Sequence, residues 1–466
     1  MIPVHLKSSR RPPVGTALVL APLLFASCKS YNDRIQHVVA DYEAGRFEVA
    51  AETFQSGEFD EAFASDIDGM LFLLEAGKVL QDAGRYPESS AMFDRAYEIM
   101  VKWDLEADVS VSDEVTAMVG TQTSLPYRGS DYDRILLDVY EVLNYLARDD
   151  FGEAMVHVRR AYRRQAEAVA RNQEEIQRRQ EDGESKETFE SEAYKELEQQ
   201  VDSLTTDAYA DFVNPMATFL SAVLLREEGT NSNAVVDLRK LAGMIPDNGY
   251  LEPLLAEFEA NAAPVPGRFY VVFENGLAPV REEWSMTVPS PVGLTRIAVP
   301  TLRPVARAAR GLRVASADGA LVLETELVAS IDSIVATDFK LNLPSRIWRI
   351  ILSQAVKEGS TAVLSNQVND STARAFLEIG ASIFKIASSG ADLRTWRTPG
   401  SEFQIAYGQV PADGHLRLTL LGVDGRSSAP IDVLLPPART TFLYVRNPRF
   451  SEIQPRVFTL GPASLD

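Results

Sequence analysis

The chain has 466 residues, of which 45% are hydrophobic and 24% charged, so its composition is that of a folded globular protein of two or three domains. The net charge of −20 at pH 7 argues against nucleic acid as a partner, because such binding depends on neutralising phosphates. The single cysteine, Cys28, excludes an internal disulfide framework, a CxxC redox pair and cysteine-based zinc or iron–sulfur sites.

The first 27 residues have the pattern of a secretory signal. A basic stretch at 7–11 precedes the apolar run 14–25, which leads through Ala26 and Ser27 to Cys28. The pattern resembles the bacterial lipoprotein signal, in which cleavage falls before the cysteine and its thiol receives a diacylglycerol. We therefore expect a lipid on Cys28 to anchor the protein in a membrane. The alternative is a buried N-terminal helix, but the run directly follows three cations and is too short to span a bilayer.

The identity of Lys29, the residue after the cysteine, indicates in which membrane the lipoprotein is expected. By resemblance to lipoprotein sorting in bacteria with two membranes, a lysine here favours the periplasmic leaflet of the outer membrane. No second hydrophobic span follows in the sequence. The expected location is therefore the cell envelope.

The composition changes near residue 264. Residues 28–263 contain 48 acidic residues, 22 basic residues and five prolines. Residues 264–466 contain 18 acidic residues, 21 basic residues and sixteen prolines. Helices tolerate few interior prolines, while strands and turns accept them at edges and corners. We predict an α+β protein of two domains after the signal peptide 1–27. An all-α domain spans 28–263, and an antiparallel-sheet domain with two or more helices spans 264–466.

The helical half contains an internal similarity that resembles the tetratricopeptide repeat. Gly77, a small residue on one expected helix, is followed twelve residues later by Ser89, a small residue on the next. The same offset recurs as Val38 and Ala50, Val142 and Ala154, and Ala222 and Ala234. Ordinary helical hairpins remain the alternative. The residues expected to pack these helices are Gly77, Gly84, Tyr86, Ser89, Phe93, Ala96, Ala154, Ala222 and Ala234.

Turns and further elements follow from local patterns. Gly45, Gly84 and Gly229 are expected at the hairpin turns, with Asp149 replacing the glycine in the third hairpin. Residues 171–202 are nearly all charged or glutamine, so we expect a solvated helix or an excursion that buries no face. Strands are predicted at 269–273, 415–420 and 441–445, and helices at 345–357 and 373–385.

Three longer phrases resemble an uncharacterised family of bacterial tetratricopeptide-like lipoproteins. They are VYEVLNYL within 132–164, VFENGLAPVREE at 272–283 and ADLRTW at 391–396. The resemblance covers most of the mature chain. It implies an envelope protein without established catalytic residues, in the neighbourhood of lipoproteins that activate peptidoglycan synthases.

Signature motifs of common enzymes are missing from the sequence. It contains no HExxH, GxxxxGK[ST], GxGxxG or GxSxG, and its histidines lie far apart, so we expect no catalytic residue, metal or cofactor. Ser382 to Lys385 matches SxxK, but the other motifs of penicillin-binding enzymes do not follow in order. Glu282 and Glu283 do not form the paired carboxylates of a glycosidase site, because neighbouring residues of a strand point to opposite faces. Arg281 beside them instead predicts a surface ion pair.

A basic cluster stands out in the acidic helical half. Arg159, Arg160, Arg163 and Arg164 occupy adjacent strips of one helix. Two interpretations stay open: pairing with carboxylates of the same chain, and contact with an acidic partner segment or the C-terminal domain.

We expect the segment ADLRTW at 391–396 to have a structural role and not to bind a ligand. Asp392 and Arg394 are expected to fix a turn by a salt bridge, and Trp348 and Trp396 to lie in the core.

These features predict an envelope lipoprotein that acts as a non-catalytic protein–protein interaction scaffold, linked to cell-wall synthesis or envelope assembly. Its helical repeats would offer a concave acidic surface to an envelope protein. The other expected partner is the membrane, through the lipid on Cys28. Two alternatives stay open: a cell-wall-active enzyme with a cleft in the C-terminal domain, and a subunit of a lipoprotein-based assembly machine.

Overall fold

The computed structural model describes residues 30–107, 126–181, 189–205, 213–261, 266–290, 293–357, 391–436 and 439–460. The expected signal peptide, Cys28 and the expected helix 373–385 lie outside these ranges. The described chain is α+β, with helices mostly in the first half and antiparallel-rich sheets in the second. The helices before the sheets are α1 (Tyr31–Glu43), α2 (Phe47–Gln55), α3 (Asp60–Phe63), α4 (Gly69–Asp82), α5 (Tyr86–Ala107), α7 (Asp131–Ala147), α8 (Phe151–Glu181), α10 (Glu192–Asp202), α11 (Pro215–Glu228), α12 (Asn231–Met244) and α13 (Leu251–Glu259).

Four helical hairpins, α1–α2, α4–α5, α7–α8 and α11–α12, stand where the sequence predicts them. The turn residue has a positive φ in each: 76° at Gly45, 81° at Gly84, 58° at Asp149 and 90° at Gly229. Its N–H bonds to the carbonyl three residues back, and the next N–H bonds to the carbonyl five residues back. This Schellman arrangement satisfies the last carbonyls of the first helix. Aspartate tolerates the left-handed region better than most residues, so Asp149 can stand in for glycine.

Small side chains lie between the paired helices. Ser89 Oγ donates a 2.6 Å hydrogen bond to the carbonyl oxygen of Gly77. A Cβ atom on Gly77 would lie 2.5 Å from the Phe93 ring, so only glycine fits there. The remaining small and apolar residues of the four interfaces are buried: Val38, Ala50, Ala96, Val142, Ala154, Ala222 and Ala234. This spacing explains the hairpins, whereas their identity as tetratricopeptide repeats stays a prediction.

The charged stretch 171–202 differs from expectation at its C-terminal end. There α10 buries Tyr194, Leu197 and Val201. It packs against the helix Ile331–Lys357 and against the hairpin formed by the strands Val280–Ser290 and Gly293–Arg303. These three residues form a narrow apolar stripe with helical spacing, which the surrounding charges obscure in the sequence. The expectation that the stretch buries no face is therefore wrong for α10.

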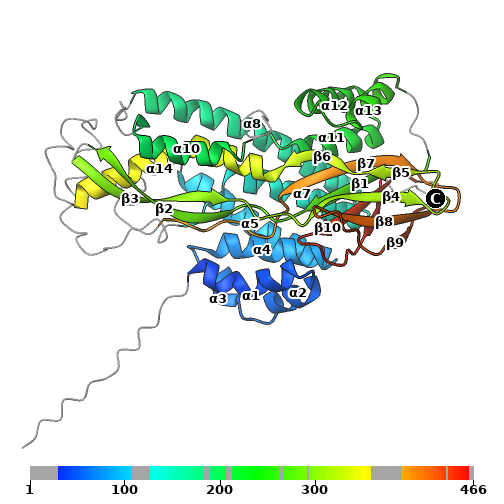
Figure 1. Cartoon of the computed structure of the whole chain (residues 1–466), viewed down its shortest axis with the longest axis horizontal. Helices are drawn as coiled ribbons and strands as arrows, with labels where there is room; N and C mark the ends of the chain where they lie inside the picture. The colour runs from blue at the N-terminus through cyan, green and yellow to red at the C-terminus, as the bar shows by residue number, and fades with distance from the viewer. Residues whose placement is uncertain are drawn as a thin grey trace, which may run out of the picture.

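The second half contains eleven described strands in three sheets. They are β1 (Arg268–Asn275), β2 (Val280–Ser290), β3 (Gly293–Arg303), β4 (Ala309–Ser316), β5 (Val322–Glu324), β6 (Glu326–Ser330), β7 (Glu402–Gln409), β8 (His415–Gly422), β9 (Ile431–Leu434), β10 (Thr441–Asn447) and β11 (Arg456–Thr459). The sheets have the orders β11-β10-β1-β7-β6, β5-β4-β8-β9 and β2-β3. Helix α14 (Ile331–Lys357) follows β6 and includes the predicted helix 345–357. Figure 1 shows β2, β3, α10 and α14 together on the left and the two larger sheets on the right.

One strand pair departs from the predicted antiparallel sheet, because β1 and β10 are parallel. All the other pairs formed by the described strands are antiparallel. A parallel pair cannot be closed by a tight hairpin. Here most of the second half of the chain lies between the two strands.

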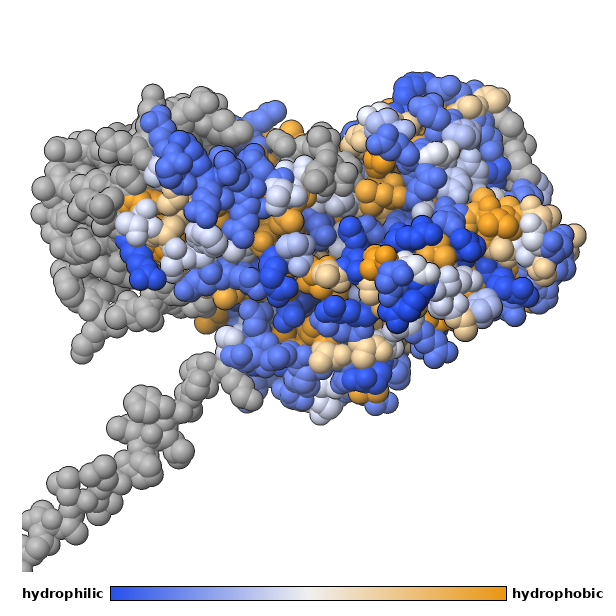
Figure 2. All heavy atoms as spheres, in the orientation of Figure 1, coloured by the Kyte–Doolittle hydropathy of each residue, from blue (hydrophilic) through white to orange (hydrophobic). Residues whose placement is uncertain are grey.

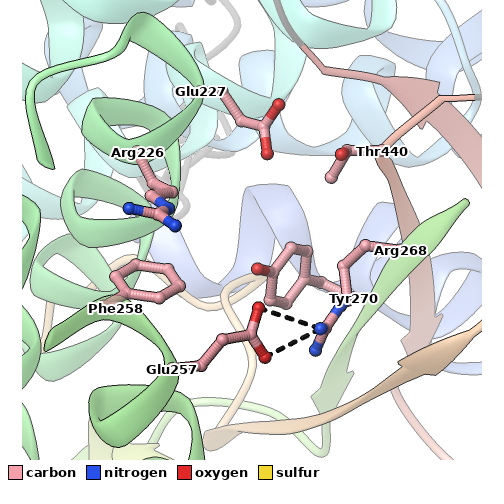
Figure 3. A pocket seen from close by; sticks show the side chains of 7 residues that line it. All are labelled: Arg226, Glu227, Glu257, Phe258, Arg268, Tyr270 and Thr440. Carbon is pink, nitrogen blue, oxygen red and sulfur yellow. Dashed lines mark hydrogen bonds and ion pairs between the residues drawn. The ribbon is translucent and has the colours of Figure 1, made fainter. Parts of the chain in front are cut away.

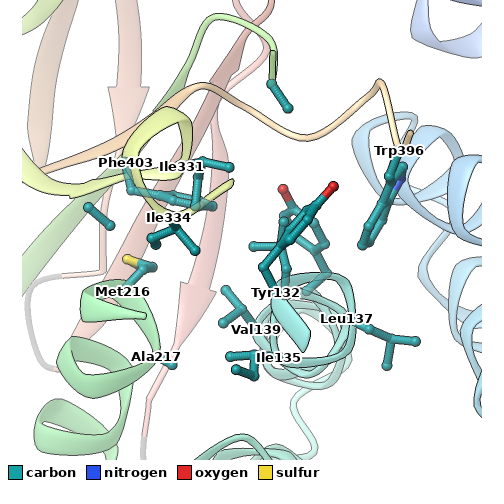
Figure 4. Close-up of a cluster of buried hydrophobic side chains, with 14 of the residues drawn as sticks. Tyr132, Ile135, Leu137, Val139, Met216, Ala217, Ile331, Ile334, Trp396 and Phe403 are labelled. Atoms are coloured by element: carbon teal, nitrogen blue, oxygen red, sulfur yellow. The ribbon is translucent and has the colours of Figure 1, made fainter. Parts of the chain in front are cut away.

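The interior contains two hydrophobic cores, because successive side chains of a strand point to opposite faces of the sheet. On β1, Tyr270 and Val272 join the core shared with the helices, whereas Phe269, Val271 and Phe273 join the core between the two larger sheets. Figure 4 shows part of the first core, where side chains of α7, α11 and α14 meet Trp396 and Phe403. The hydrophobic core is therefore continuous from the helices to the five-stranded sheet, with the four-stranded sheet stacked on the far face.

Replacing Gly77 by alanine tests the close packing of α4 and α5. We expect Gly77→Ala to lower the free energy of unfolding by about 1–3 kcal/mol, because the new methyl group meets the Phe93 ring. Gly243→Ala in α12 is the control, since its Cβ would meet nothing within 4 Å and should stabilise by about 0.5–1 kcal/mol. Urea denaturation measures both, and equal effects would contradict the packing argument.

Candidate functional site

A charged cluster lies inside the core, where α4 faces β1 and β10. Every residue of α4 is buried, yet the helix carries Glu75, Lys78 and Asp82 at successive turns of one face. Charged side chains are almost never fully buried unless they are paired. The cluster therefore depends on partners from the rest of the chain.

The ammonium group of Lys78 uses all three of its donors. Its Nζ lies 2.6 Å from Asp82 Oδ2, 3.1 Å from Glu274 Oε2 and 3.1 Å from Tyr444 Oη. The same atom lies 4.6 Å from the centre of the Tyr140 ring, which adds a cation–π contact. Lys78 is thus bound to the helix that carries it and to two strands of the sheet.

A second cation enters from β10. Arg446 lies opposite Glu274 in the register of the parallel β1–β10 pair, and its Nε lies 3.7 Å from Glu274 Oε1. It donates to Tyr42 Oη at 2.9 Å and to the carbonyl oxygens of Thr398 at 3.0 Å and Gly276 at 2.7 Å. The two buried cations, Lys78 and Arg446, therefore balance the charges of the two carboxylates nearest to them, Asp82 and Glu274.

Tyrosine hydroxyls complete the cluster. Tyr140 donates to Glu274 Oε1 at 2.8 Å, and Tyr444 Oη lies 2.5 Å from Glu274 Oε2. Tyr42 Oη lies 2.5 Å from Asp82 Oδ2. Burial raises the pKa of all three tyrosines well above its ordinary value, so they remain protonated donors at neutral pH.

The pKa of Glu274 is set by opposing effects. Burial on its own raises the pKa, but Lys78 and Arg446, together with the tyrosine hydroxyls, outweigh burial and hold it below the ordinary value of 4.5. Because the folded pKa is depressed, the stabilisation is present above pH 4.5 and is lost as the pH falls through the folded pKa. Glu274 is therefore ionised at neutral pH.

An extended segment, Ala391–Ser401, lies between the sheet and the helices, and we call it the strap. Glu75 accepts hydrogen bonds from Arg397 N at 2.7 Å, from Thr398 N at 3.2 Å and Thr398 Oγ1 at 2.6 Å, and from Tyr31 Oη at 2.7 Å. Burial raises the pKa of this carboxylate above its ordinary value, and the hydrogen bonds offset only part of that rise. The strap thereby joins α1 and α4 to the sheet.

Trp396 fixes the middle of the strap. Its side chain is fully buried, and its ring centroid lies 5.6 Å from that of Tyr140 and 6.1 Å from that of Phe93. Asp392 and Arg394 form a bidentate pair at 2.8 Å, and Arg394 also lies 2.9 Å from Asp68. The predicted salt bridge and the core position of Trp396 are both confirmed, while the Trp348 side chain is outside the described residues.

The structure separates the four clustered arginines into two kinds. Arg160 and Arg164 face inward, where they lie 3.8 Å and 3.1 Å from Asp138 and stack over the Tyr97 ring. The other two are exposed: Arg159 pairs with Glu228 at 2.6 Å, and Arg163 with Glu167 at 3.5 Å. All four have carboxylate partners in the same chain, and Arg159 and Arg163 are the more exposed pair.

Another buried carboxylate, outside the cluster, lies between α5, α7 and α8. Glu141 Oε2 accepts a 2.7 Å hydrogen bond from Ser90 Oγ, with Asn144 Nδ2 at 3.4 Å, whereas its Oε1 is buried without a hydrogen bond. Burial raises the pKa of Glu141 to about 7, partly offset by these donors and by His157. His157 itself pairs with Asp138 at 2.9 Å. The half-satisfied carboxylate makes this group sensitive to pH near neutrality.

A small pocket opens where α11 and α13 meet β1 and β10. Arg226, Glu227, Glu257, Phe258, Arg268, Tyr270 and Thr440 line it. Figure 3 shows Glu257 and Arg268 paired at its side, with nitrogen–oxygen distances of 2.8 and 2.9 Å. Its interior of about 10 Å³ holds roughly one water molecule. The pocket is too small for a substrate.

Other sequence candidates have structural partners or fall outside the described residues. Glu282 pairs with Arg303, and Glu283 accepts from the backbone N–H of the first strap residue. Arg281 does not form the predicted surface ion pair, because it is buried and donates to the carbonyl of Arg394 at 2.8 Å. The SxxK element at 382–385 lies outside the described residues.

The buried cluster was missed by sequence reasoning, although α4 carries a signal for it. Glu75, Lys78 and Asp82 interrupt an otherwise apolar helix at the spacing of one face, which indicates charges directed into the core. Glu274 comes from β1, in the second half of the chain. Its true partner comes from α4, and nothing local in the sequence connects those two segments.

Replacing Lys78 tests whether the buried ion pairs are essential. We expect Lys78→Met to lower the free energy of unfolding by about 3–5 kcal/mol, because Asp82 and Glu274 would keep buried charge without their ammonium partner. Arg417→Met, which removes an exposed pair with Asp432, should cost at most about 1 kcal/mol. Guanidinium denaturation compares the two, and a small effect at Lys78 would show that Arg446 alone suffices.

The pH dependence of Glu141 gives a separate test. Its raised pKa means that the folded state holds the proton more tightly, so its contribution to stability decreases as the pH rises from 4.5 to about 7. Glu141→Gln removes this loss and keeps the shape of the side chain. The variant should match the native protein in melting temperature at pH 4.5 and be more stable at pH 8 by about 3 kcal/mol. A difference that does not change with pH would refute the assignment.

Within the described residues, no three His, Cys, Asp or Glu side chains are grouped so as to bind a metal ion, and no helix is long and apolar enough to cross a membrane. Comparison of the chain with known protein families, with curated proteins and with solved structures finds no match.

Proposed function

We propose that this protein is a lipid-anchored scaffold of the cell envelope, which binds a protein partner without catalysing a reaction and serves cell-wall synthesis or envelope assembly. The lipoprotein pattern ending at Cys28 supports the anchor, and Lys29 supports the periplasmic leaflet of the outer membrane. The helical hairpins support the scaffold, because stacked hairpins resembling tetratricopeptide repeats provide extended surfaces for other proteins.

One observation carries the proposal: the buried cluster is closed to solvent. Lys78 and Glu274 have fully buried side chains, and Asp82 and Arg446 are almost completely buried. Catalytic acids and bases must approach a substrate to within hydrogen-bond distance. The contacts of these groups described above are all with other buried groups of the same chain, so their arrangement favours a role in holding the helices and the sheet together.

The surface available to a partner lies on the second helix of each hairpin. The first helices α4, α7 and α11 are largely buried beneath the sheet and the strap, so the face expected from sequence to receive a partner is covered by the chain itself. The second helices expose most of the large apolar residues on the helical half: Val49, Val101, Leu105, Val156, Tyr162 and Val236. In Figure 2 apolar side chains form small groups among polar ones.

Three exposed side chains of different kinds lie on α8 and α12. Val236 and Lys240 lie one turn apart on α12, and the Lys240 Nζ is 5.9 Å from the ring centre of Tyr162 on α8. Val236 is 58% exposed and Tyr162 is 57% exposed. Exposed aromatic and aliphatic side chains beside charge are typical of protein interfaces. We name Tyr162, Val236 and Lys240 the α8–α12 patch.

Photo-crosslinking in living cells tests this proposal. A benzophenone amino acid at position 236 or 162 should capture one protein reproducibly, whereas the same group at the exposed Val322 of β5 should capture it at least fivefold less. The Cys28→Ser variant should lose both metabolic palmitate labelling and the crosslink, because the protein leaves the membrane. Labelling that persists in Cys28→Ser, or crosslinks equally strong at all three positions, would contradict the proposal.

A further inference from the structure

We infer that Arg307, Asp332 and Glu402 form a latch at the start of α14, which is closed while Asp332 carries a proton and loosens when Asp332 is ionised. The latch joins the first turn of α14 to the end of the strap. The inference concerns the folded body alone and does not depend on the proposed lipid anchor or on a partner. Three observations carry it: how the helix begins, how the two carboxylates are paired, and how near the latch lies to solvent.

The first turn of α14 is attached to the strap by its backbone. The N–H groups of Ile331 and Asp332 donate to the carbonyl oxygen of Ser401 at 2.8 and 3.1 Å. The next N–H group, that of Ser333, donates to Ser330 Oγ at 3.1 Å, which caps the helix. Because these three donors are already bound, none of them is free to bind the carboxylate of Asp332. The usual preference of a helix N-terminus for negative charge is therefore reduced at this position.

Two carboxylates meet one guanidinium group beside this turn. Arg307 Nη1 lies 2.9 Å from Glu402 Oε2 but 3.8 Å from Asp332 Oδ2. Glu402 has further donors, since its Oε1 accepts from Asn275 Nδ2 at 2.9 Å and from Gln404 Nε2 at 2.7 Å. Asp332 Oδ1 is buried and accepts no hydrogen bond from the residues that the structure describes. Of the two carboxylates, Asp332 is therefore the one that gains from a proton.

The charge on Asp332 changes with pH near neutrality. Burial raises the pKa of Asp332 to about 7, while Arg307 lowers the pKa and Glu402 raises it. Within the described chain these are the two charged groups that face Asp332, Arg307 from the segment between β3 and β4 and Glu402 from the start of β7. Because the folded pKa is raised, the stabilisation is complete below the ordinary value of 3.8 and is lost as the pH rises to about 7. Ionised Asp332 therefore favours a separation that brings its oxygens to water.

The latch lies near the surface, so a local movement can open it. The side chains of Asp332 and Arg307 are 15% and 40% exposed. Further along the helix, Ile334, Val335 and Phe339 are buried in the core, so the opening involves the first turn and not the whole helix. Beyond this turn α14 packs against α10 and β3 (Figure 1). The latch thus sets how firmly the strap holds the helix on which those elements rest.

Hydrogen exchange in the purified full-length protein tests the latch. Mass spectrometry measures the exchange rates of the N–H groups of Ile331 and Asp332 at pH 6 and pH 8, and each rate is divided by the intrinsic rate at that pH. With the ordinary pKa of 3.8 for Asp332 in the open state, we expect these normalised rates to rise about tenfold between the two pH values. The N–H groups of Met216 and Ala217 are the internal control, because they donate to Asn214, which has no charge to gain or lose. Their normalised rates should change by less than about twofold.

Three variants assign the effect to the latch. Asp332→Asn keeps the shape of the side chain and removes its charge, so its normalised rates should be equal at pH 6 and pH 8. Arg307→Gln removes the cation that lowers the pKa of Asp332, so the rise should exceed tenfold, and this variant provides the test if Asp332→Asn folds poorly. Glu141→Gln, at the separate carboxylate between α5, α7 and α8, should leave the tenfold rise unchanged. Equal normalised rates at both pH values in the native protein, a rise that persists in Asp332→Asn, or no larger rise in Arg307→Gln would overturn the inference.

Discussion

Burying an ammonium group costs several kcal/mol unless counter-ions and hydrogen bonds surround it, and Lys78 meets this requirement only where helices and sheet come together. Asp82 comes from its own helix, whereas Glu274 and Tyr444 come from β1 and β10. The cluster can therefore exist only when the sheet is docked. A non-directional apolar interface would accept several orientations, but these hydrogen bonds require one, so the cluster fixes how the two halves of the chain pack.

The strap and the shared core follow from the same docking. Glu75 binds the strap backbone, and Trp396 fills the space between α5 and α7, so the first helices are covered by segments of the chain itself. A hairpin array that uses its inner face for its own sheet has only its outer face left for other proteins. This division between an inner structural face and an outer face explains why Arg160 and Arg164 are internal while Arg159 and Arg163 are exposed.

The proposed anchor and the rigid body have a joint consequence. Because α1 begins three residues after Cys28, a lipid there would hold the start of α1 close to the bilayer. A partner that binds the α8–α12 patch would then have to lie within reach of the membrane.

The sequence by itself determined the local features: four hairpins with their turns, the apolar strands, the pair Asp392–Arg394 and the lipoprotein pattern at Cys28. These depend on residues close together in the chain, where spacing, glycine positions and alternation act directly. Only the tertiary structure decided that β1 pairs in parallel with β10, that the inner helices are covered, and that Lys78 meets Glu274. Those contacts join segments far apart in the chain, and their stability comes from burial that exists only once the whole core has formed.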